Sequence, residues 1–199
     1  MAAIPETYYT AYGSLKNMRV ETSDTVLVRG ATSGVGVAFL HLLKSEFPQV
    51  RVDGTSRSLT KEAQLLAVGF DGVVEDRDGQ LQTNTAYDKM FELIGPATVK
   101  DSFLHLNEGG IVCSTGKLGG QWYLEDFDPI FDIKANSYLT AFYSGNVDDD
   151  KLNEMLAYID SNDTPVRPEK VFSLDEIQDA HRYLDSSHSF GKVVVVNHQ

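Results

Sequence analysis

The chain has 199 residues, 42% of them hydrophobic, and a formal net charge of −12. This length and composition fit one globular domain with a substantial core, or one domain with a fragment of a second. The acidic balance argues against nucleic-acid and anionic-membrane binding, because both need clustered Lys and Arg. No apolar run approaches the roughly 18 residues of a membrane span, and the N-terminus lacks a secretory signal pattern, so we expect a soluble, cytoplasmic protein.

The first half of the chain alternates predicted strands and helices. Pro5 and Glu6 open a helix that runs through Leu15. A buried strand follows at 25–29, and a helix is predicted at 37–44. The next segments are a strand at 50–56, a helix from Ser58 or Thr60 to Gly69, a short strand at 73–74, a segment at 87–94 that closes on Gly95, a helix at 97–106 ended by residues 107–110, and a strand at 111–115.

The pattern loosens after Gly116 and then returns. We predict a strand at 136–143 and a helix from Asp148 through Ile159. The aspartates at 148–150 are typical of a helix N-terminus rather than of a metal site. Residues 173–176 form a capping box that opens another helix, and a buried strand follows at 193–196.

Alternating strands and helices of this kind predict an α/β fold with a doubly wound parallel sheet. In such sheets ligands bind beyond the carboxyl ends of the strands. Gly30, Ser56, Gly95 and Gly116 all fall at that edge, so four separate segments place small or polar residues on one rim.

The stretch from Gly30 to Gly36 joins the first strand to its helix and contains Thr32, Ser33, Gly34 and Val35. Strand, glycine turn and helix in this order are typical of a pyrophosphate-binding loop, because small residues let the backbone approach and the helix N-terminus favours an anion. The usual G-x-G-x-x-G spacing is altered to Ala31-x-Ser33-x-x-Gly36. The alternative is a tight turn without a ligand.

The end of the second strand favours NADP(H) over NAD(H). Ser56, Arg57 and Ser58, with Lys61 one turn further on, suit a ribose 2′-phosphate. An NAD site usually carries an acidic residue there, but we expect Asp53 to lie within the strand. The alternative is that Arg57 and Lys61 are simply solvated.

The lone cysteine and the scattered histidines do not indicate a metal or a nucleophile. Cys113 lies in a predicted strand, where a buried core thiol is expected, and one cysteine allows no intramolecular disulfide. The five histidines show no ligand spacing, so we expect no metal site.

Motifs spread along the whole chain resemble the medium-chain dehydrogenase/reductase superfamily, in its zinc-type alcohol dehydrogenase and quinone oxidoreductase group. The chain is most similar to the zinc-independent quinone oxidoreductase branch. The segments that carry the resemblance are 2–6, 10–12, 33–36, 55–58 with Lys61, 92–95, 109–116, 176–182 and 191–195.

The resemblance implies an NADPH-dependent reductase that passes a hydride to a quinone, enone or aldehyde, and a homodimer. It places Thr10 near the nicotinamide, Thr32 to Val35 on the pyrophosphate, and Ser56, Arg57 and Lys61 on the 2′-phosphate. The remaining cofactor-binding residues that it implies flank the ribose and nicotinamide: Leu93, Ile94, Gly95, Thr115, Gly116, Lys117, Thr140 and Phe142.

The chain departs from the family pattern in three places. Asp76 or Arg77 stands where many relatives have a tyrosine beside the adenine, and Glu6 stands where zinc-dependent relatives have a cysteine ligand. The separate substrate domain that precedes the cofactor domain in the family has no counterpart. We therefore expect 1–20 to be a junction helix, 21–165 the NAD(P)-binding domain, and 166–199 a helix and strand that return toward a substrate domain.

Two other functions fit parts of the sequence. A short-chain dehydrogenase needs Tyr-x-x-x-Lys downstream of the glycines, and the spacing occurs only upstream, at Tyr12 and Lys16. A non-catalytic NADP(H)-binding or interaction module remains the alternative, because an acceptor must be held against the nicotinamide for hydride transfer. We expect this chain by itself to bind cofactor with little turnover, and no catalytic residue is identified.

Overall fold

The structure is a computed structural model that describes residues 2–134, 136–186 and 188–197. Its main body is a seven-stranded sheet in the order β4-β3-β2-β1-β5-β6-β7, parallel throughout except for the antiparallel pair β3 and β4. The strands are β1 Thr25–Arg29, β2 Arg51–Ser56, β3 Gly72–Arg77, β4 Gln80–Leu81, β5 Tyr87–Glu92, β6 Leu106–Ser114 and β7 Tyr138–Ala141. From β1 the chain first adds strands on one side, through β2 to β4, and then on the other side, through β5 to β7. This strand order confirms the predicted doubly wound α/β fold.

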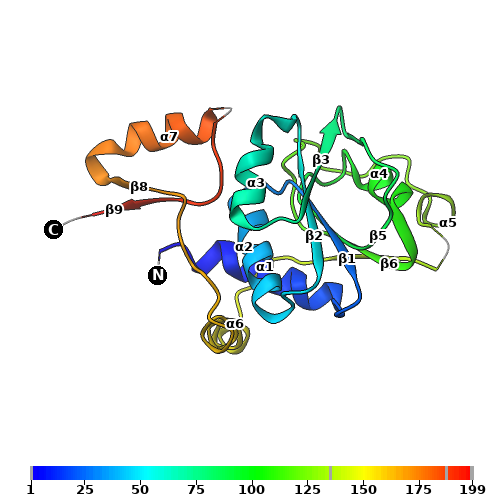
Figure 1. The fold of residues 1–199 in the computed structure, drawn as a ribbon, viewed down its shortest axis with the longest axis horizontal. Coiled ribbons are helices and arrows are strands. Elements are labelled where there is room, and N and C mark those ends of the chain that lie inside the picture. The colour runs from blue at the N-terminus through cyan, green and yellow to red at the C-terminus, as the bar shows by residue number, and fades with distance from the viewer. Residues whose placement is uncertain (1, 135, 187, 198–199) are drawn as a thin grey trace.

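Helices cover both faces of the sheet (Figure 1). The helices of the structure are α1 Pro5–Met18, α2 Gly34–Glu46, α3 Glu62–Val68, α4 Val99–Leu104, α5 Pro129–Asp132, α6 Asp149–Ser161 and α7 Ile177–Asp185, of which α7 lies outside the main sheet. Val26 and Val28 of β1 pack in the core shared with α1 and α2, whereas Leu27 packs in a second core with Val99 and Phe103 of α4. The two-residue period of the strand therefore divides its side chains between the two cores.

A small two-stranded unit follows the main body. β8 Lys170–Ser173 pairs in parallel with β9 Val193–Val196, and α7 connects them. Figure 1 shows this unit to one side of the sheet, beyond α3. The carboxylate of Glu176 accepts hydrogen bonds from the amide and hydroxyl of Ser173, at 2.9 and 2.8 Å, which bears out the acidic half of the predicted capping box.

The helix after the glycine turn begins three residues earlier than the predicted Val37. Ser33 is the N-cap of α2, and its hydroxyl accepts a 3.1 Å hydrogen bond from the amide of Gly36. A side-chain cap of this kind satisfies one of the free amides of the first turn. The predicted bounds missed it because the apolar periodicity begins only at Val37.

The segment 97–110 also differs from its prediction. The expected helix at 97–106 is shortened to α4, and residues 107–110 lie inside β6 rather than ending a helix. The register between β5 and β6 shifts between Tyr87 and Lys89, and Gly109 has φ +76. In the sequence, Gly109 and Gly110 resemble the end of a helix. In the structure they belong to an irregular part of a strand, where glycines are common.

Some further elements, β4 among them, differ from the prediction or were not predicted. The strand predicted at 136–143 is confined to β7, and neither α5 nor β8 was predicted. Asp148 acts as N-cap of α6 by accepting from the amide of Lys151 at 3.0 Å, as expected for aspartates at a helix start. No helix in the described ranges is long and apolar enough to cross a membrane.

Candidate functional site

The glycine turn lies at the carboxyl edge of the sheet, between β1 and α2. Gly30 has φ +88, a conformation that favours glycine, and the amide of Ser33 donates to its carbonyl at 3.1 Å. The amide of Gly30 donates to the hydroxyl of Thr55 at the end of β2, at 3.0 Å. The positive end of α2 therefore faces the rim where β1 and β2 end, as an anion site requires.

A groove of about 1240 Å³ runs along this rim. Predicted cofactor residues that line it are Thr32, Ser33, Ser56, Arg57, Lys61 and Ile94. Its other walls come from the end of β3 and the turn after it, from the residue that precedes α4, and from the segment before β9. The residues are Asp76, Arg77, Asp78, Gly79, Thr98, His188 and Ser189. The structure thus brings the glycine turn and the predicted 2′-phosphate residues together in one groove.

The basic end of the groove holds two cations. The ammonium group of Lys61 donates to the carbonyl of Ser189 at 2.6 Å, and burial together with the charge of Arg57 lowers the pKa of Lys61. Among the residues that the structure describes, Arg57 has no hydrogen bond or ion pair, and it is exposed. Two neighbouring cations, one with a side chain that has no partner among the described residues, meet the requirements of an anion site.

Asp53 lies within β2, as expected, and not at its end. It is buried, it accepts a 2.9 Å hydrogen bond from the hydroxyl of Tyr87, and Arg51 pairs with it. Its carboxylate therefore binds partners on the face of the sheet that α4 covers. This is consistent with its exclusion as a ribose ligand.

Two loops at the other end of the rim pack backbone against backbone. The amides of Thr115, Leu118 and Gly119 donate to the carbonyls of Glu92, Leu93 and Ile94, at 2.9, 3.0 and 2.9 Å. Gly95 has φ +90, and a Cβ atom there would collide with the carbonyl oxygen of Gly116. The close approach of the loops requires glycine at both positions.

A second cavity of about 400 Å³ lies beside these loops. The predicted residues Thr115, Gly116, Lys117 and Thr140 line it, together with the apolar side chains of Pro96, Val99, Leu124, Leu139 and Ala141. Lys117 donates to the carbonyl of Trp122 at 3.1 Å and lies 4.9 Å from the centre of its ring. The groove and this cavity flank the β5–α4 loop from two sides.

The other predicted residues lie near the rim but line neither cavity. Thr10 is buried in α1, where its hydroxyl donates to the carbonyl of Glu6 at 2.8 Å. The ring of Phe142 packs directly on Gly13 and against Tyr9, with ring centres 5.7 Å apart. Two more of them, Gly34 and Val35, lie in the first turn of α2, and Leu93 and Gly95 lie in the loop after β5. The cofactor contacts of all these residues stay predictions.

A short polar chain links α1 to the rim. The hydroxyl of Ser14 donates to the carbonyl of Thr10 at 2.8 Å and lies 3.0 Å from the hydroxyl of Thr115. Ser14 thereby connects Thr10 in α1 with Thr115 directly after β6, although the two threonines are distant in sequence. Cys113 is buried beside this chain, and burial raises the pKa of its thiol, as for a core cysteine.

The sequence did not point to the segment before β9 as part of the groove. The amide of Gly191 donates to the carbonyl of Thr32 at 2.9 Å, and Ser189 contacts Lys61, 128 residues earlier. His188 and Ser189 therefore lie at the basic end of the groove. No local pattern at 186–191 signals this position, because it depends on how α7 and β9 return to the main body.

A zinc site does not fit the side chains present. In the part of the chain that the structure describes, no group of three or more His, Cys, Asp or Glu side chains is arranged to hold a metal ion. A carboxylate oxygen of Glu6, where zinc-dependent relatives carry a cysteine, accepts from the hydroxyl of Thr7 at 3.4 Å. We derive no step through zinc from these residues.

Comparison with known proteins identifies a family and several relatives of this chain. A family model described as a zinc-binding dehydrogenase matches residues 68–195, more than half of the chain. A 2-methylene-furan-3-one reductase of Solanum lycopersicum is 25% identical over 198 residues, which cover 98% of this chain and 46% of the reductase. The chain thus spans less than half the length of this relative.

Two solved structures share the fold. The quinone oxidoreductase of Coxiella burnetii has a TM-score of 0.72 at 21% identity, over 98% of this chain and 59% of that protein. A mycobacterial protein solved with NADPH has a TM-score of 0.75 at 22% identity, over 98% of this chain and 64% of that protein. From its matched segments and its fold, the chain belongs to the zinc-binding dehydrogenase family, in the medium-chain dehydrogenase/reductase superfamily.

Proposed function

We propose that the chain is the NADP(H)-binding part of a reductase that passes a hydride to a quinone, enone or aldehyde acceptor. The observation that carries the proposal is the groove that runs from the glycine turn to Arg57 and Lys61. The relatives support it, since one is a furanone reductase, one a quinone oxidoreductase and one was solved with NADPH.

Each part of the groove has a chemical role in this proposal. Ser33 to Val35 place small side chains and the N-terminus of α2 against the pyrophosphate. Arg57 and Ser56 accommodate the 2′-phosphate, together with Lys61. The loops at Leu93–Gly95 and Thr115–Lys117, with Thr10, Thr140 and Phe142, bound the ribose and nicotinamide. Bound NADPH supplies the hydride, and these residues orient it and exclude water.

The acceptor site is proposed to need a further domain. The chain spans 46% of the tomato reductase, and the unit of β8, β9 and α7 exposes apolar side chains at Val171, Leu174, Ile177 and Leu184. In this proposal residues 21–165 bind the cofactor, and 1–20 and 166–199 adjoin the substrate domain. The chain alone then binds NADPH with little turnover.

We also propose that the protein is a homodimer. β7 is an edge strand of the sheet. Apolar side chains are exposed in it and in the segments on either side of it, at Trp122, Tyr123, Ile130, Phe131, Tyr138 and Tyr143. Sheet edges and apolar patches of this kind are typical of association surfaces.

The test of the function compares binding with turnover. NADPH binding is measured by the change in its fluorescence, and NADPH oxidation is measured with a series of quinones and enones. Binding with slow oxidation supports the proposal for this chain. Binding without any oxidation, even when a substrate domain from a relative is fused to the chain, favours a non-catalytic NADP(H)-binding module. Failure to bind either NADPH or NADH contradicts both functions.

A further inference from the structure

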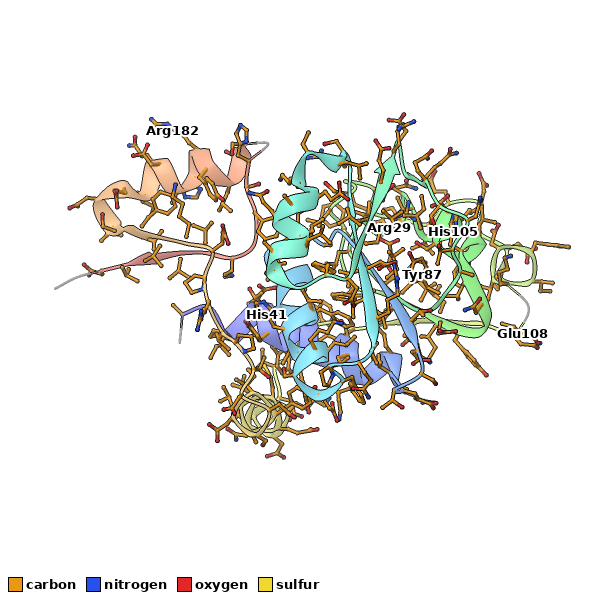
Figure 2. The ribbon with its side chains drawn as sticks, in the orientation of Figure 1. Arg29, His41, Tyr87, His105, Glu108 and Arg182 are labelled. Atoms are coloured by element: carbon orange, nitrogen blue, oxygen red, sulfur yellow. The ribbon has the colours of Figure 1, made fainter. Side chains whose placement is uncertain are left out.

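The most unusual buried group in the chain is the guanidinium of Arg29. Arg29 ends β1 on the same face as Leu27, and its side chain is completely buried on the α4 side of the sheet. Figure 2 shows it inside the main body, whereas Arg182 projects from α7. Burying a cation costs several kcal/mol or more unless it is paired and hydrogen-bonded, so its partners must be accounted for.

One set of partners comes from the end of β3 and from the turn that leads to β4. Nε and Nη2 of Arg29 donate to the two carboxylate oxygens of Asp76, at 2.7 and 3.0 Å, in a bidentate pair. Nη2 also donates to the carbonyl of Gly79 at 2.8 Å. Planar bidentate pairing fixes orientation as well as distance, so Arg29 holds this turn in place.

A second set comes from α4 and its preceding turn. Nη1 of Arg29 donates to the carbonyl of Thr98 and the hydroxyl of Ser102, at 3.1 and 2.9 Å. Nη1 lies 2.9 Å from a carboxylate oxygen of Asp101, which in turn accepts from the amide of Leu81 at 3.1 Å. The same guanidinium therefore joins α4 to the β3–β4 turn.

Glu92 extends the network to the β5–α4 loop. Its carboxylate lies 3.8 Å from Nε of Arg29 and accepts from the amides of Ile94 and Gly95, at 2.7 and 3.1 Å. The hydroxyls of Thr98 and Ser102 donate to its other oxygen, at 3.1 and 2.6 Å. Burial raises the pKa of Glu92 in spite of these partners. Burial alone would lower the pKa of Arg29, but Asp76, Glu92 and Asp101 together raise it, so the guanidinium stays charged.

The network lies directly behind the groove. Asp76, Gly79, Ile94 and Thr98 each take part in it and each also line the groove of about 1240 Å³. The β3–β4 turn and the β5–α4 loop are separate walls of that groove, and Arg29 contacts both. Their separation is therefore set by one side chain that does not itself line the groove.

We propose that Arg29 is a positioning residue for the nucleotide: it fixes the spacing between the Asp76–Gly79 wall and the Ile94–Thr98 wall so that the adenosine half of the cofactor fits between them. This inference rests on the proposed function, since it takes the groove as the NADP(H) site. A buried ion pair is weak evidence for a role in stability, because well-packed apolar groups often replace such pairs at no cost.

The test uses two variants of the intact chain and a matched control. Arg29→Lys keeps the charge and loses the planar fork. The double variant Arg29→Met with Asp76→Asn removes the main pair, one positive and one negative charge, and leaves the net charge of the network unchanged. The carboxylates of Glu92 and Asp101 lose the guanidinium but keep their other hydrogen-bond donors. Arg182→Met is the control, because it removes an exposed arginine that pairs only with Asp179 among the described residues. Calorimetric titrations with NADPH, NADH and 2′,5′-ADP give a Kd and a stoichiometry for each protein.

Both Arg29 variants are expected to raise the Kd of all three ligands roughly tenfold, which corresponds to about 1.4 kcal/mol, with the stoichiometry unchanged. The control is expected to bind like the wild type. A purely structural role would lower the stoichiometry through unfolded protein and leave the Kd of the folded fraction unchanged, and this result would overturn the proposal. So would unchanged binding by the folded Arg29→Lys protein, or failure of both variants to fold. A wild-type protein that binds no nucleotide refutes the proposed function instead.

Discussion

At the scale of single residues, the two cations at the basic end of the groove differ in their contacts. The ammonium group of Lys61 contacts the carbonyl of Ser189, whereas Arg57 is exposed at the end of β2. Arg57 is therefore the side chain that is best placed to respond to an added phosphate. Lys61 supplies charge from a fixed position, and its pKa is lowered by burial and by Arg57.

Arg57→Ala is expected to weaken NADPH binding by about 1.5 to 3 kcal/mol, the range for hydrogen bonds to a charged group. NADH lacks the 2′-phosphate, so its affinity should change little. Fluorescence titration with both cofactors measures the ratio. Arg77→Ala is a control for this ratio, which it should leave unchanged, because this arginine also lines the groove but pairs with Glu75 at 2.6 Å. Equal losses for NADPH and NADH in Arg57→Ala would contradict the assignment.

At the scale of the elements, the start of α2 combines a helix cap with the proposed pyrophosphate site. Ser33→Ala removes the acceptor of the amide of Gly36 and should cost about 1 kcal/mol of unfolding free energy. Asp148→Ala removes the corresponding cap of α6 and should cost a similar amount. Only the Ser33 variant should also lose NADPH affinity. Urea unfolding and NADPH titration of both proteins separate the two effects, and equal NADPH affinities would argue against the glycine turn as the site.

The amino ends of β1, β5 and β6 are joined by one carboxylate. Asp88 accepts from the amide and hydroxyl of Thr25 and from the side chain of Asn107, all at 2.8 Å. Burial by itself raises the pKa of Asp88, but these hydrogen bonds and the charge of Lys89 outweigh it and lower the pKa. The ionised form is therefore favoured by folding.

Since this pKa is lowered, the contribution of Asp88 to stability is present above the ordinary value of about 3.9 and is lost as the pH falls through the lowered folded pKa. Asp88→Asn should cost about 1 kcal/mol at pH 7, after allowance for its partial exposure. The difference from wild type should shrink below about pH 4. Urea unfolding at pH 7 and pH 3 tests this, with the exposed Asp160→Asn as control. A difference that is independent of pH would contradict the mechanism.

At the scale of the whole molecule, one edge of the main sheet and one face of the C-terminal unit both expose apolar side chains. The edge formed by β7 and the segment before it is the proposed dimer surface, and the unit of β8, β9 and α7 is the proposed neighbour of a substrate domain. In Figure 1, α5, which belongs to the segment before β7, lies on the opposite side of the main body from α7. The two surfaces can therefore be tested separately.

Ile130→Glu with Phe131→Glu should convert a dimer into a monomer, because it places two charges on side chains that are 83% and 85% exposed. Multi-angle light scattering after size-exclusion chromatography measures the mass. Leu66→Glu, on α3, is a control at an exposed leucine away from β7 and should leave the mass unchanged. A wild-type chain that is monomeric at micromolar concentration would refute the dimer.

The sequence by itself determined the features that depend on near neighbours in the chain. The strand and helix alternation, the proline at the start of α1, the acidic cap of α6 and the glycine turn are all local signals, and the sheet order agrees with them. The rim residues could be placed for a similar reason, because parallel strands must end at one edge. The family resemblance added the expected cofactor residues.

Only the tertiary structure decided the contacts between distant segments. Ser189 meets Lys61 across 128 residues, and Asp76 meets Arg29 across 47. β8 also exists as a strand only through its pairing with β9, and the glycines of β6 belong to a strand irregularity rather than to a helix end. Local propensity carries no information on such partners, because burial and ion pairing are set by packing that brings remote residues together.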